Sequence, residues 1–391
     1  MNKALSRWMP RKLLIPGLIV LLAGSSLAIM RQRVDFGSGL GKRGGFVDLF
    51  VSSEQGISLI LHESGKDAWG FFEWPSKGSY GFFNGSRKED GEIRANVQSA
   101  GPSMVLTVFP GSPARAGESG PARNLRLRLE GEGEPSGDFA LKRQKMPDIV
   151  LEVREGRLDG ATRILSPLLH LFERLSVEDG LQNGNLSFFY VAALGAGTGL
   201  LGEFLDTRLR RGLNPDDYSR NHWKAFIDGR KAVSDILRWP SVLVERQYFV
   251  SAYPSVYSFA TERYVFEGGA HGNTTLLIEM IDAKSGRTLQ PDDIFVDGWK
   301  EPVAEKLRKE ALRLLSGADG KAPASGSLVD RGFFEERIPP STNVFLCESG
   351  VGFHYDRYQL APYSFGDFTF VLRWKELGGL LKASWLEGKL P

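Results

Sequence analysis

Short strand-like runs recur about every ten residues between Phe46 and Gln144, and this spacing constrains the fold more than any other feature. The runs are rich in β-branched and aromatic residues and lie at 57–61, 68–74, 79–83, 92–97, 104–109, 125–129 and 138–141. Turns rich in Gly, Ser, Asp and Pro separate them, and no run is long enough for a helix. Many short strands in succession are typical of an antiparallel barrel or sandwich. We therefore predict a small all-β domain over residues 46–147, with barrel and sandwich both open.

The pattern changes after residue 148. Helical periodicity is predicted at 165–175, 188–211 and 223–237, and strands at 149–153, 241–246, 248–253, 255–266, 274–281, 343–346, 352–355 and 368–374. A further helix is expected at 300–315, since Val303, Leu307, Ala311 and Leu314 fall on one face. Residues 148–391 are thus predicted to form an α+β domain with a mainly antiparallel sheet packed by helices.

The N-terminus combines a basic start with an apolar run. Four basic residues come first, followed by the uncharged stretch 13–30. This order is typical of a segment whose front end stays in the cytoplasm while the rest of the chain is exported. Residues 1–33 then contain either an uncleaved anchor over 13–30, which we favour, or a signal peptide cleaved near Ala28. Residues 34–45 are predicted to be a tether. We expect an exported protein, either anchored in the membrane or released to the periplasm or extracellular space.

Charge and cysteine content exclude several classes. Subtracting the four basic residues before Leu13 from the formal net charge of +2 leaves about −2 for the rest, so nucleic acid is not an expected partner. Cys347 is the single cysteine, which excludes an internal disulfide and a cysteine-based zinc site. The five histidines contain no His-x-x-x-His spacing. We expect no cofactor and no metal.

The turn at 268–272 is the strongest candidate for a site. Gly268, Gly269 and Gly272 surround His271. Glycine adopts backbone geometry that residues with a Cβ avoid, so this density indicates a shaped turn. His271 could act as a general base, bind a metal with His354, or tie the turn to a neighbouring strand through its ring nitrogens. We favour a structural or binding role.

Three further patterns follow this turn. The segment YVFEGGAHG at 264–272 precedes DAKSGRTL at 282–289, DDIF at 292–295 and the tyrosine-rich GVGFHYDRYQLAPYSFG at 350–366. In this order they resemble the extracellular C-terminal domain of RsiV-type anti-sigma factors, which is similar to a domain of PdaC-type peptidoglycan deacetylases. The resemblance covers residues 242–381.

The resemblance implies recognition rather than catalysis. RsiV-type proteins use this domain to bind host lysozyme, and they also carry a cytoplasmic sigma-binding part, for which the twelve residues before Leu13 are too short. PdaC-type proteins keep their zinc deacetylase in a separate domain whose paired-histidine motif is missing here. Only the exported recognition part is therefore expected.

The other candidate binding residues are Asp282, His354, Tyr355, Tyr358 and Tyr363. The tyrosines, with Arg357, could form an aromatic surface for a glycan or a protein, although core packing is expected for at least two of them. Asp282 could pair with Glu267 as acid and base, although carboxylates at strand ends usually face water.

Aromatic residues of the β domain offer one more candidate. Trp69 and Trp74, with Phe71 and Phe72, could line a barrel mouth that binds sugar or acyl chains. We favour the simpler interpretation that they fill a small barrel.

The sequence contains no complete catalytic set, and we assign no catalytic residue. We predict a non-catalytic envelope protein that binds or senses a protein, lysozyme-like, or a peptidoglycan-related ligand. The alternative is an envelope hydrolase that uses His271 with nearby carboxylates. That alternative requires an open His271 beside acidic groups.

Overall fold

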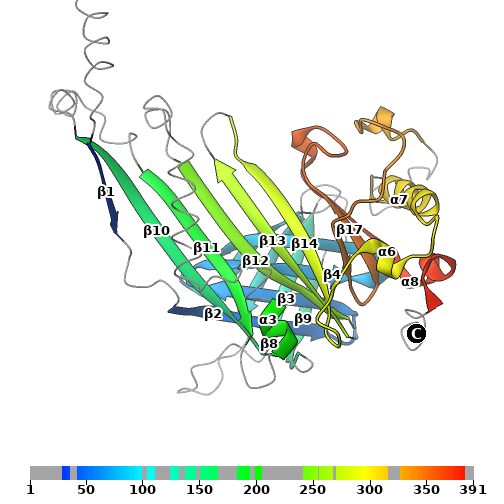
Figure 1. Ribbon diagram of the computed structural model, residues 1–391. Helices are drawn as coiled ribbons and strands as arrows, with labels where there is room; N and C mark the ends of the chain where they lie inside the picture. The colour runs from blue at the N-terminus through cyan, green and yellow to red at the C-terminus, as the bar shows by residue number, and fades with distance from the viewer. Residues whose placement is uncertain are drawn as a thin grey trace, which may run out of the picture.

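The computed structural model describes residues 29–35, 42–98, 104–110, 124–131, 137–146, 150–165, 183–193, 199–204, 241–253, 255–266, 270–315 and 326–383. Its strands form one continuous 15-stranded sheet, part of which closes into a barrel, and a separate 3-stranded sheet (Figure 1). The α+β class is therefore confirmed, and the N-terminal β structure is a barrel rather than a sandwich.

The barrel contains eight antiparallel strands in simple up-and-down order. They are β2 (Lys42–Ser52), β3 (Ile57–Ser64), β4 (Asp67–Trp74), β5 (Ser79–Arg87), β6 (Ile93–Gln98), β7 (Met104–Pro110), β8 (Asn124–Gly131) and β9 (Gly137–Gln144). The short 3-10 helix η1 (Pro75–Lys77) joins β4 to β5. β9 pairs back onto β2 at Leu49–Val51, so the barrel closes and leaves no open edge there.

Side chains fill the barrel. Strand β8 alternates, with Leu125, Leu127 and Leu129 buried in the lumen and Arg126 exposed outside. Phe72 belongs to the same lumen cluster, as does Trp74, which contacts Phe139 there. An eight-stranded barrel is just wide enough for such packing. Trp69 and Phe71 lie instead in the cluster outside the barrel.

A second group of long strands continues from the barrel. The first half of β2 pairs with β10 (Leu151–Leu165), and the order then runs through β11 (Asn183–Ala193), β12 (Ser241–Tyr253), β13 (Val256–Phe266), β14 (Asn273–Asp282) and β15 (Thr288–Leu289). β1 (Ile29–Asp35) pairs with the far end of β10. β12 runs parallel to β11, which requires a long crossover, and α3 (Gly199–Phe204) lies within it.

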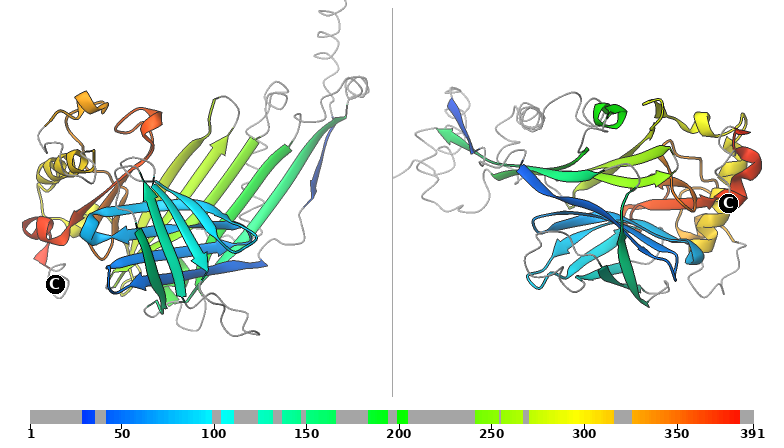
Figure 2. Two further views of the ribbon diagram at one scale, coloured as in Figure 1. Left: turned by 180° about the vertical axis from the view of Figure 1, so that it is seen from behind. Right: turned by 90° about the horizontal axis from the view of Figure 1, so that it is seen from below.

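The barrel packs against this sheet through its outer wall (Figure 2). Trp69 Nε1 donates to the Gln247 carbonyl at 2.9 Å, and His62 Nε2 accepts from the Phe249 amide at 2.8 Å. The two rings stack with centroids 5.6 Å apart. Burial lowers the pKa of His62 to about 3, so this imidazole is neutral.

The C-terminal part is a small sheet covered by helices. β16 (Val344–Leu346), β17 (Gly350–Tyr355) and β18 (Phe368–Arg373) are antiparallel, with β17 in the middle. Around them lie α6 (Pro291–Ile294), α7 (Lys300–Leu315), η3 (Val329–Arg331), η4 (Tyr363–Phe365), α8 (Trp374–Leu377) and η5 (Gly378–Leu380). The predicted helix at 300–315 is confirmed, and Val303, Leu307 and Ala311 are buried in the core.

Several sequence-based predictions are wrong or lie outside the described residues. The helix expected at 188–211 is wrong up to Ala193, because these residues belong to β11. Gly199–Phe204 is helical, and residues 194–198 and 205–211 lie outside the described residues. The apolar run up to Ala193 is a strand that pairs with β10 on one side and β12 on the other. Hydrophobic periodicity alone does not distinguish such a buried strand from a buried helix. The helix expected at 165–175 begins inside β10, and the remainder lies outside the described residues, as does 223–237.

The N-terminal predictions are tested only in part. Strand β1 includes Met30, and β1 and β2 occupy parts of the predicted tether at 34–45. Residues 13–28 lie outside the described part of the chain. Among the residues that the structure describes, no helix has both the length and the apolar character required to cross a membrane. Export, anchoring and the domain boundaries stay predictions.

Candidate functional site

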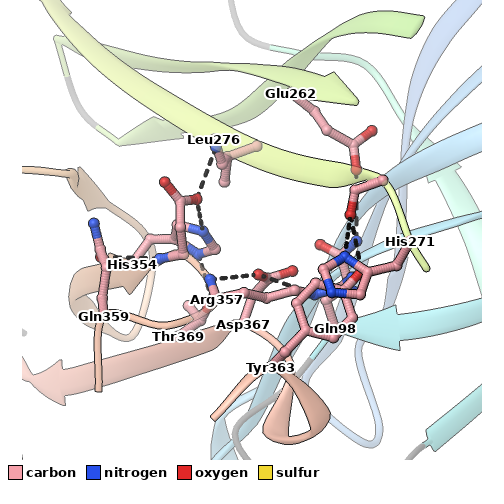
Figure 3. Close-up of polar contacts among 12 residues, drawn as sticks. Gln98, Glu262, His271, Leu276, His354, Arg357, Gln359, Tyr363, Asp367 and Thr369 are labelled. Atoms are coloured by element: carbon pink, nitrogen blue, oxygen red, sulfur yellow. Dashed lines mark hydrogen bonds and ion pairs between the residues drawn. The ribbon is translucent and has the colours of Figure 1, made fainter. Parts of the chain in front are cut away.

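The candidate site lies where the β13–β14 turn meets the connection between β17 and β18 (Figure 3). Two side chains hold these segments together by binding the outer edge of β14. The Leu276 amide donates to Asp356 Oδ1 at 2.8 Å, and the Leu276 carbonyl accepts from Asn343 Nδ2 at 2.7 Å. The Ile278 amide donates to Asn343 Oδ1 at 3.2 Å. The Asn343 amide thereby replaces the peptide group of a neighbouring strand.

We call Asn343 and Asp356, which bind the edge of β14, the clamp. His354 contacts Asp356 and is 1% exposed. Its Nε2 lies 3.3 Å from Asp356 Oδ1 and its Nδ1 lies 3.1 Å from the Thr369 hydroxyl. A carboxylate accepts hydrogen bonds, so Nε2 carries the proton and Nδ1 accepts from Thr369. Both ring nitrogens are therefore used inside the protein, and His354 has a structural role.

His271 lies on the open side of the same junction. Its Nδ1 is 3.0 Å from the Gly272 carbonyl, so Nδ1 is the protonated nitrogen in that contact. The ring stacks on Tyr363 with centroids 3.7 Å apart and an interplanar angle of 17°. The side chain is exposed, and its Nε2 makes no hydrogen bond to the described residues. His271 thus presents one ring nitrogen and one ring edge to solvent.

Tyr363 connects this ring to the following segment. Its hydroxyl donates to the Gly272 carbonyl at 3.1 Å and accepts from Arg357 Nη1 at 2.6 Å. The Arg357 guanidinium also lies 4.7 Å from the centre of the Tyr363 ring, within cation–π range. Behind it, buried Asp367 accepts from the Arg357 amide at 3.0 Å, and burial raises the pKa of Asp367. Tyr363 is therefore held at both its ring and its hydroxyl.

Tyr358 completes the cluster and is the most exposed of its tyrosines, at 56%. Its ring centroid is 5.5 Å from that of Tyr363. Its φ of 66° lies in the left-handed region that a non-glycine residue rarely adopts. We call His271, Arg357, Tyr358 and Tyr363 the aromatic surface. It combines the hydrogen-bonded rings of His271 and Tyr363 with the exposed Tyr358 ring and a guanidinium, on two adjacent loops.

Of the remaining candidates that the structure describes, only Gly272 lies at this surface, through its carbonyl contacts with His271 and Tyr363. Tyr355 is buried, donates to the Pro339 carbonyl at 2.8 Å and belongs to the C-terminal core. Asp282 lies at the opposite end of β14 from His271, where it caps a turn by accepting from Ser285 Oγ at 2.6 Å. Gly268, Gly269 and Glu267 lie outside the described residues. Gly272 is buried, and a Cβ there would lie 2.4 Å from the Tyr264 ring, so a larger residue would require that ring to move.

The chemistry available to His271 is limited. Its recorded partners among the described residues are a carbonyl and a tyrosine ring, and no carboxylate lies within hydrogen-bond distance. His354 cannot join it as a ligand pair, because both of its nitrogens are used elsewhere. Within the described ranges, no three His, Cys, Asp or Glu residues are grouped as a metal site would require. The arrangement is suited to contact with a ligand.

The sequence did not reveal the residues that support the site from the protein interior. Asn343 and Asp367 were not singled out, because their roles depend on which strand edge and which arginine lie opposite them. A weak signal was present for Asp367, which directly follows the segment YSFG.

Residues 292–375 match the model of one protein family. The family is DUF3298, a protein family of unknown function. The DUF3298 match runs from α6 to α8, so it includes Arg357, Tyr358 and Tyr363 and stops short of His271. The finer resemblance to RsiV-type and PdaC-type proteins stays a prediction.

Two solved structures are similar to this chain. A DUF3298 family member from Bacteroides fragilis NCTC 9343 is 19% identical with a TM-score of 0.45, covering 53% of this chain and 88% of its own. A DUF3298 family protein from Pseudomonas aeruginosa PAO1 is 16% identical with a TM-score of 0.42, covering 61% and 96%. Neither likeness bears on function. No curated protein matches the sequence.

Proposed function

We propose that this chain is a non-catalytic recognition protein of the bacterial cell envelope and that the aromatic surface binds a protein partner. The observation that carries the proposal is the stack of His271 on Tyr363, with Tyr358 beside it and Arg357 bonded to the tyrosine hydroxyl. Tyrosine and arginine dominate the binding energy of protein interfaces, and they do so best when they are held in place before binding.

The backbone at Tyr358 supports the same conclusion. A tyrosine held at φ 66° costs about 1–2 kcal/mol relative to ordinary backbone geometry. The ring held there is largely exposed, so core packing does not repay that cost. Strained positions of this kind concentrate at binding sites. We therefore attribute the strained backbone to a requirement for an exposed tyrosine ring at this position.

The proposal is tested by calorimetric binding of the full-length chain to lysozymes and, separately, to soluble peptidoglycan fragments, with turnover assays on the same fragments. We expect saturable binding to a protein without turnover, weakened by about tenfold or more in Tyr358→Ala, as for an interface hot spot. The matched control is Phe334→Ala, which removes another ring that is 52% exposed but lies outside the aromatic surface.

Three outcomes would count against this function. Equal weakening by Phe334→Ala would mean that the aromatic surface is not the contact. Binding of peptidoglycan fragments alone would replace the protein partner by a glycan or peptide. Turnover that His271→Ala abolishes would establish the hydrolase alternative instead.

A further inference from the structure

A pocket of about 120 Å³ lies between the barrel and the C-terminal part, away from the aromatic surface. Its barrel wall is formed by residues 75–78 and Tyr80, and its other wall by Glu310 and Arg313 of α7 with Val371 and Arg373 of β18. In Figure 2 the barrel and the C-terminal helices lie side by side. We propose that this pocket binds a small anionic ligand through a carboxylate or phosphate group.

Arg313 fixes the shape of the pocket. Its Nη2 donates to the Gly78 carbonyl at 3.0 Å, which joins α7 to the turn after η1. Gly78 has a φ of 60°, and a Cβ there would lie 2.7 Å from Arg313 Nη2. The left-handed backbone favours glycine at this position, and a larger residue would also displace the Arg313 guanidinium. The two walls are thus held at a defined separation by a direct contact.

The charges lining the pocket favour an anion. Three cations, Lys77, Arg313 and Arg373, line the pocket with one carboxylate, Glu310, and Arg373 is also ion-paired with Glu376. Glu310 is already neutralised, because Arg313 Nε and Nη2 donate to its two oxygens at 2.8 and 2.7 Å. Within the described part of the chain Lys77 has no ion pair. The pocket therefore has an excess of one positive charge, that of Lys77, which an anionic ligand can balance.

The hydrogen-bonding groups point to the same ligand class. Lysine and arginine donate and never accept. Arg373 uses Nε and Nη2 to bind Glu376, and its Nη1 has no acceptor among the described residues. Tyr80 also lines the pocket, and its buried hydroxyl lacks a partner there as well. A carboxylate or phosphate supplies several acceptor oxygens to such a set of donors.

The size of the pocket limits the ligand. A water molecule takes about 30 Å³ in the liquid, so the pocket has room for roughly four. A carboxylate or phosphate with a few attached atoms fits, whereas drug-sized ligands occupy cavities of about 300 Å³ or more. The peptide C-terminus and the free phosphate ion are the two sources with this chemistry. Because the ligand would contact both walls, it would also strengthen the docking of the barrel on the C-terminal part.

The test measures binding of the full-length chain to two probes at constant ionic strength, potassium phosphate and N-acetyl-alanyl-alanine, with chloride as reference. Calorimetry and thermal unfolding should show saturable binding of at least one probe and a raised Tm. The Lys77 side chain makes no hydrogen bond to the residues that the structure describes, so Lys77→Gln should weaken binding by about tenfold through the lost charge alone. Arg373→Lys keeps the charge but loses the planar donors, and should weaken binding by a smaller factor.

The control is Lys375→Gln, which removes an exposed lysine close to the pocket that does not line it. Binding unchanged in this variant and reduced in the other two would support the site, and the preferred probe would identify its source. The proposal is overturned if neither probe binds saturably at concentrations up to about 10 mM, tenfold above a millimolar Kd. It is equally overturned if all three variants lose affinity alike, or if Lys77→Gln and Arg373→Lys bind as tightly as the wild type.

Discussion

Two histidines, His62 on the barrel wall and His271 on the aromatic surface, have similar partners in opposite surroundings. Each uses one ring nitrogen to bond a backbone group, and each stacks on an aromatic ring. His62 is fully buried between the barrel and β12, whereas His271 is exposed. The contacts of His62 therefore hold the barrel against the sheet, whereas His271 remains available to a ligand.

The largest expected effect concerns the ring on which His62 stacks. Trp69 is completely buried and bonds the β12 backbone, so Trp69→Ala removes packing and leaves the Gln247 carbonyl without its donor. We expect a loss of about 3–5 kcal/mol in the free energy of unfolding, typical of deleting a buried aromatic ring. Urea denaturation measures it. A loss below about 1 kcal/mol would show that the barrel and β12 do not depend on this contact.

The next effect depends on pH. The pKa of His62 is lowered to about 3 in the folded protein from an ordinary value of 6.5, so below pH 6.5 the unfolded chain binds a proton that the folded chain does not. Stability from this group is fully present above pH 6.5 and decreases as the pH falls toward 3, by about 1.4 kcal/mol per pH unit.

His62→Gln should remove this dependence, because the glutamine oxygen can still accept from the Phe249 amide but does not titrate. Between pH 7.5 and 5.0 the wild type should lose about 2 kcal/mol more than the variant. The difference between the two profiles isolates His62 from buried carboxylates such as Glu73, whose raised pKa acts in the opposite direction. Parallel profiles would mean that His62 can be protonated within the fold.

These two regions also differ in how far the sequence predicted them. The barrel strands were predictable, because β-branched and aromatic runs separated by turn residues require only local information. That Trp69 faces outward while Trp74 fills the lumen was not predicted, since it depends on which strand packs outside. His271 and the tyrosine-rich segment were singled out from their glycines and rings. Their separation from Asp282 was not, because it follows from the length of β14 as a continuous strand.

A smaller effect is expected at the clamp that supports the aromatic surface. Asn343→Ala leaves the Leu276 carbonyl and the Ile278 amide of β14 without partners at a half-buried edge. The expected loss is about 1–3 kcal/mol, the cost of unsatisfied buried polar groups. Asn343→Asp is the matched variant, because it keeps the acceptor for Ile278 but places a carboxylate oxygen against the Leu276 carbonyl, and it should cost at least as much. Hydrogen exchange at Ile278 should accelerate in Asn343→Ala; an unchanged rate would contradict the clamp.

The smallest effect on stability is expected at Tyr358, and it sharpens the comparison most. Tyr358→Gly relieves left-handed strain of about 1–2 kcal/mol but adds a glycine entropy cost of about 0.5–1 kcal/mol, so its stability should equal that of the wild type or exceed it by up to about 1.5 kcal/mol. Tyr358→Ala keeps the strain and loses the same ring. If the ring makes the contact, both variants should lose partner binding equally, although Tyr358→Gly is the more stable of the two. Retained binding in either variant would mean that the strained backbone has a purely structural cause.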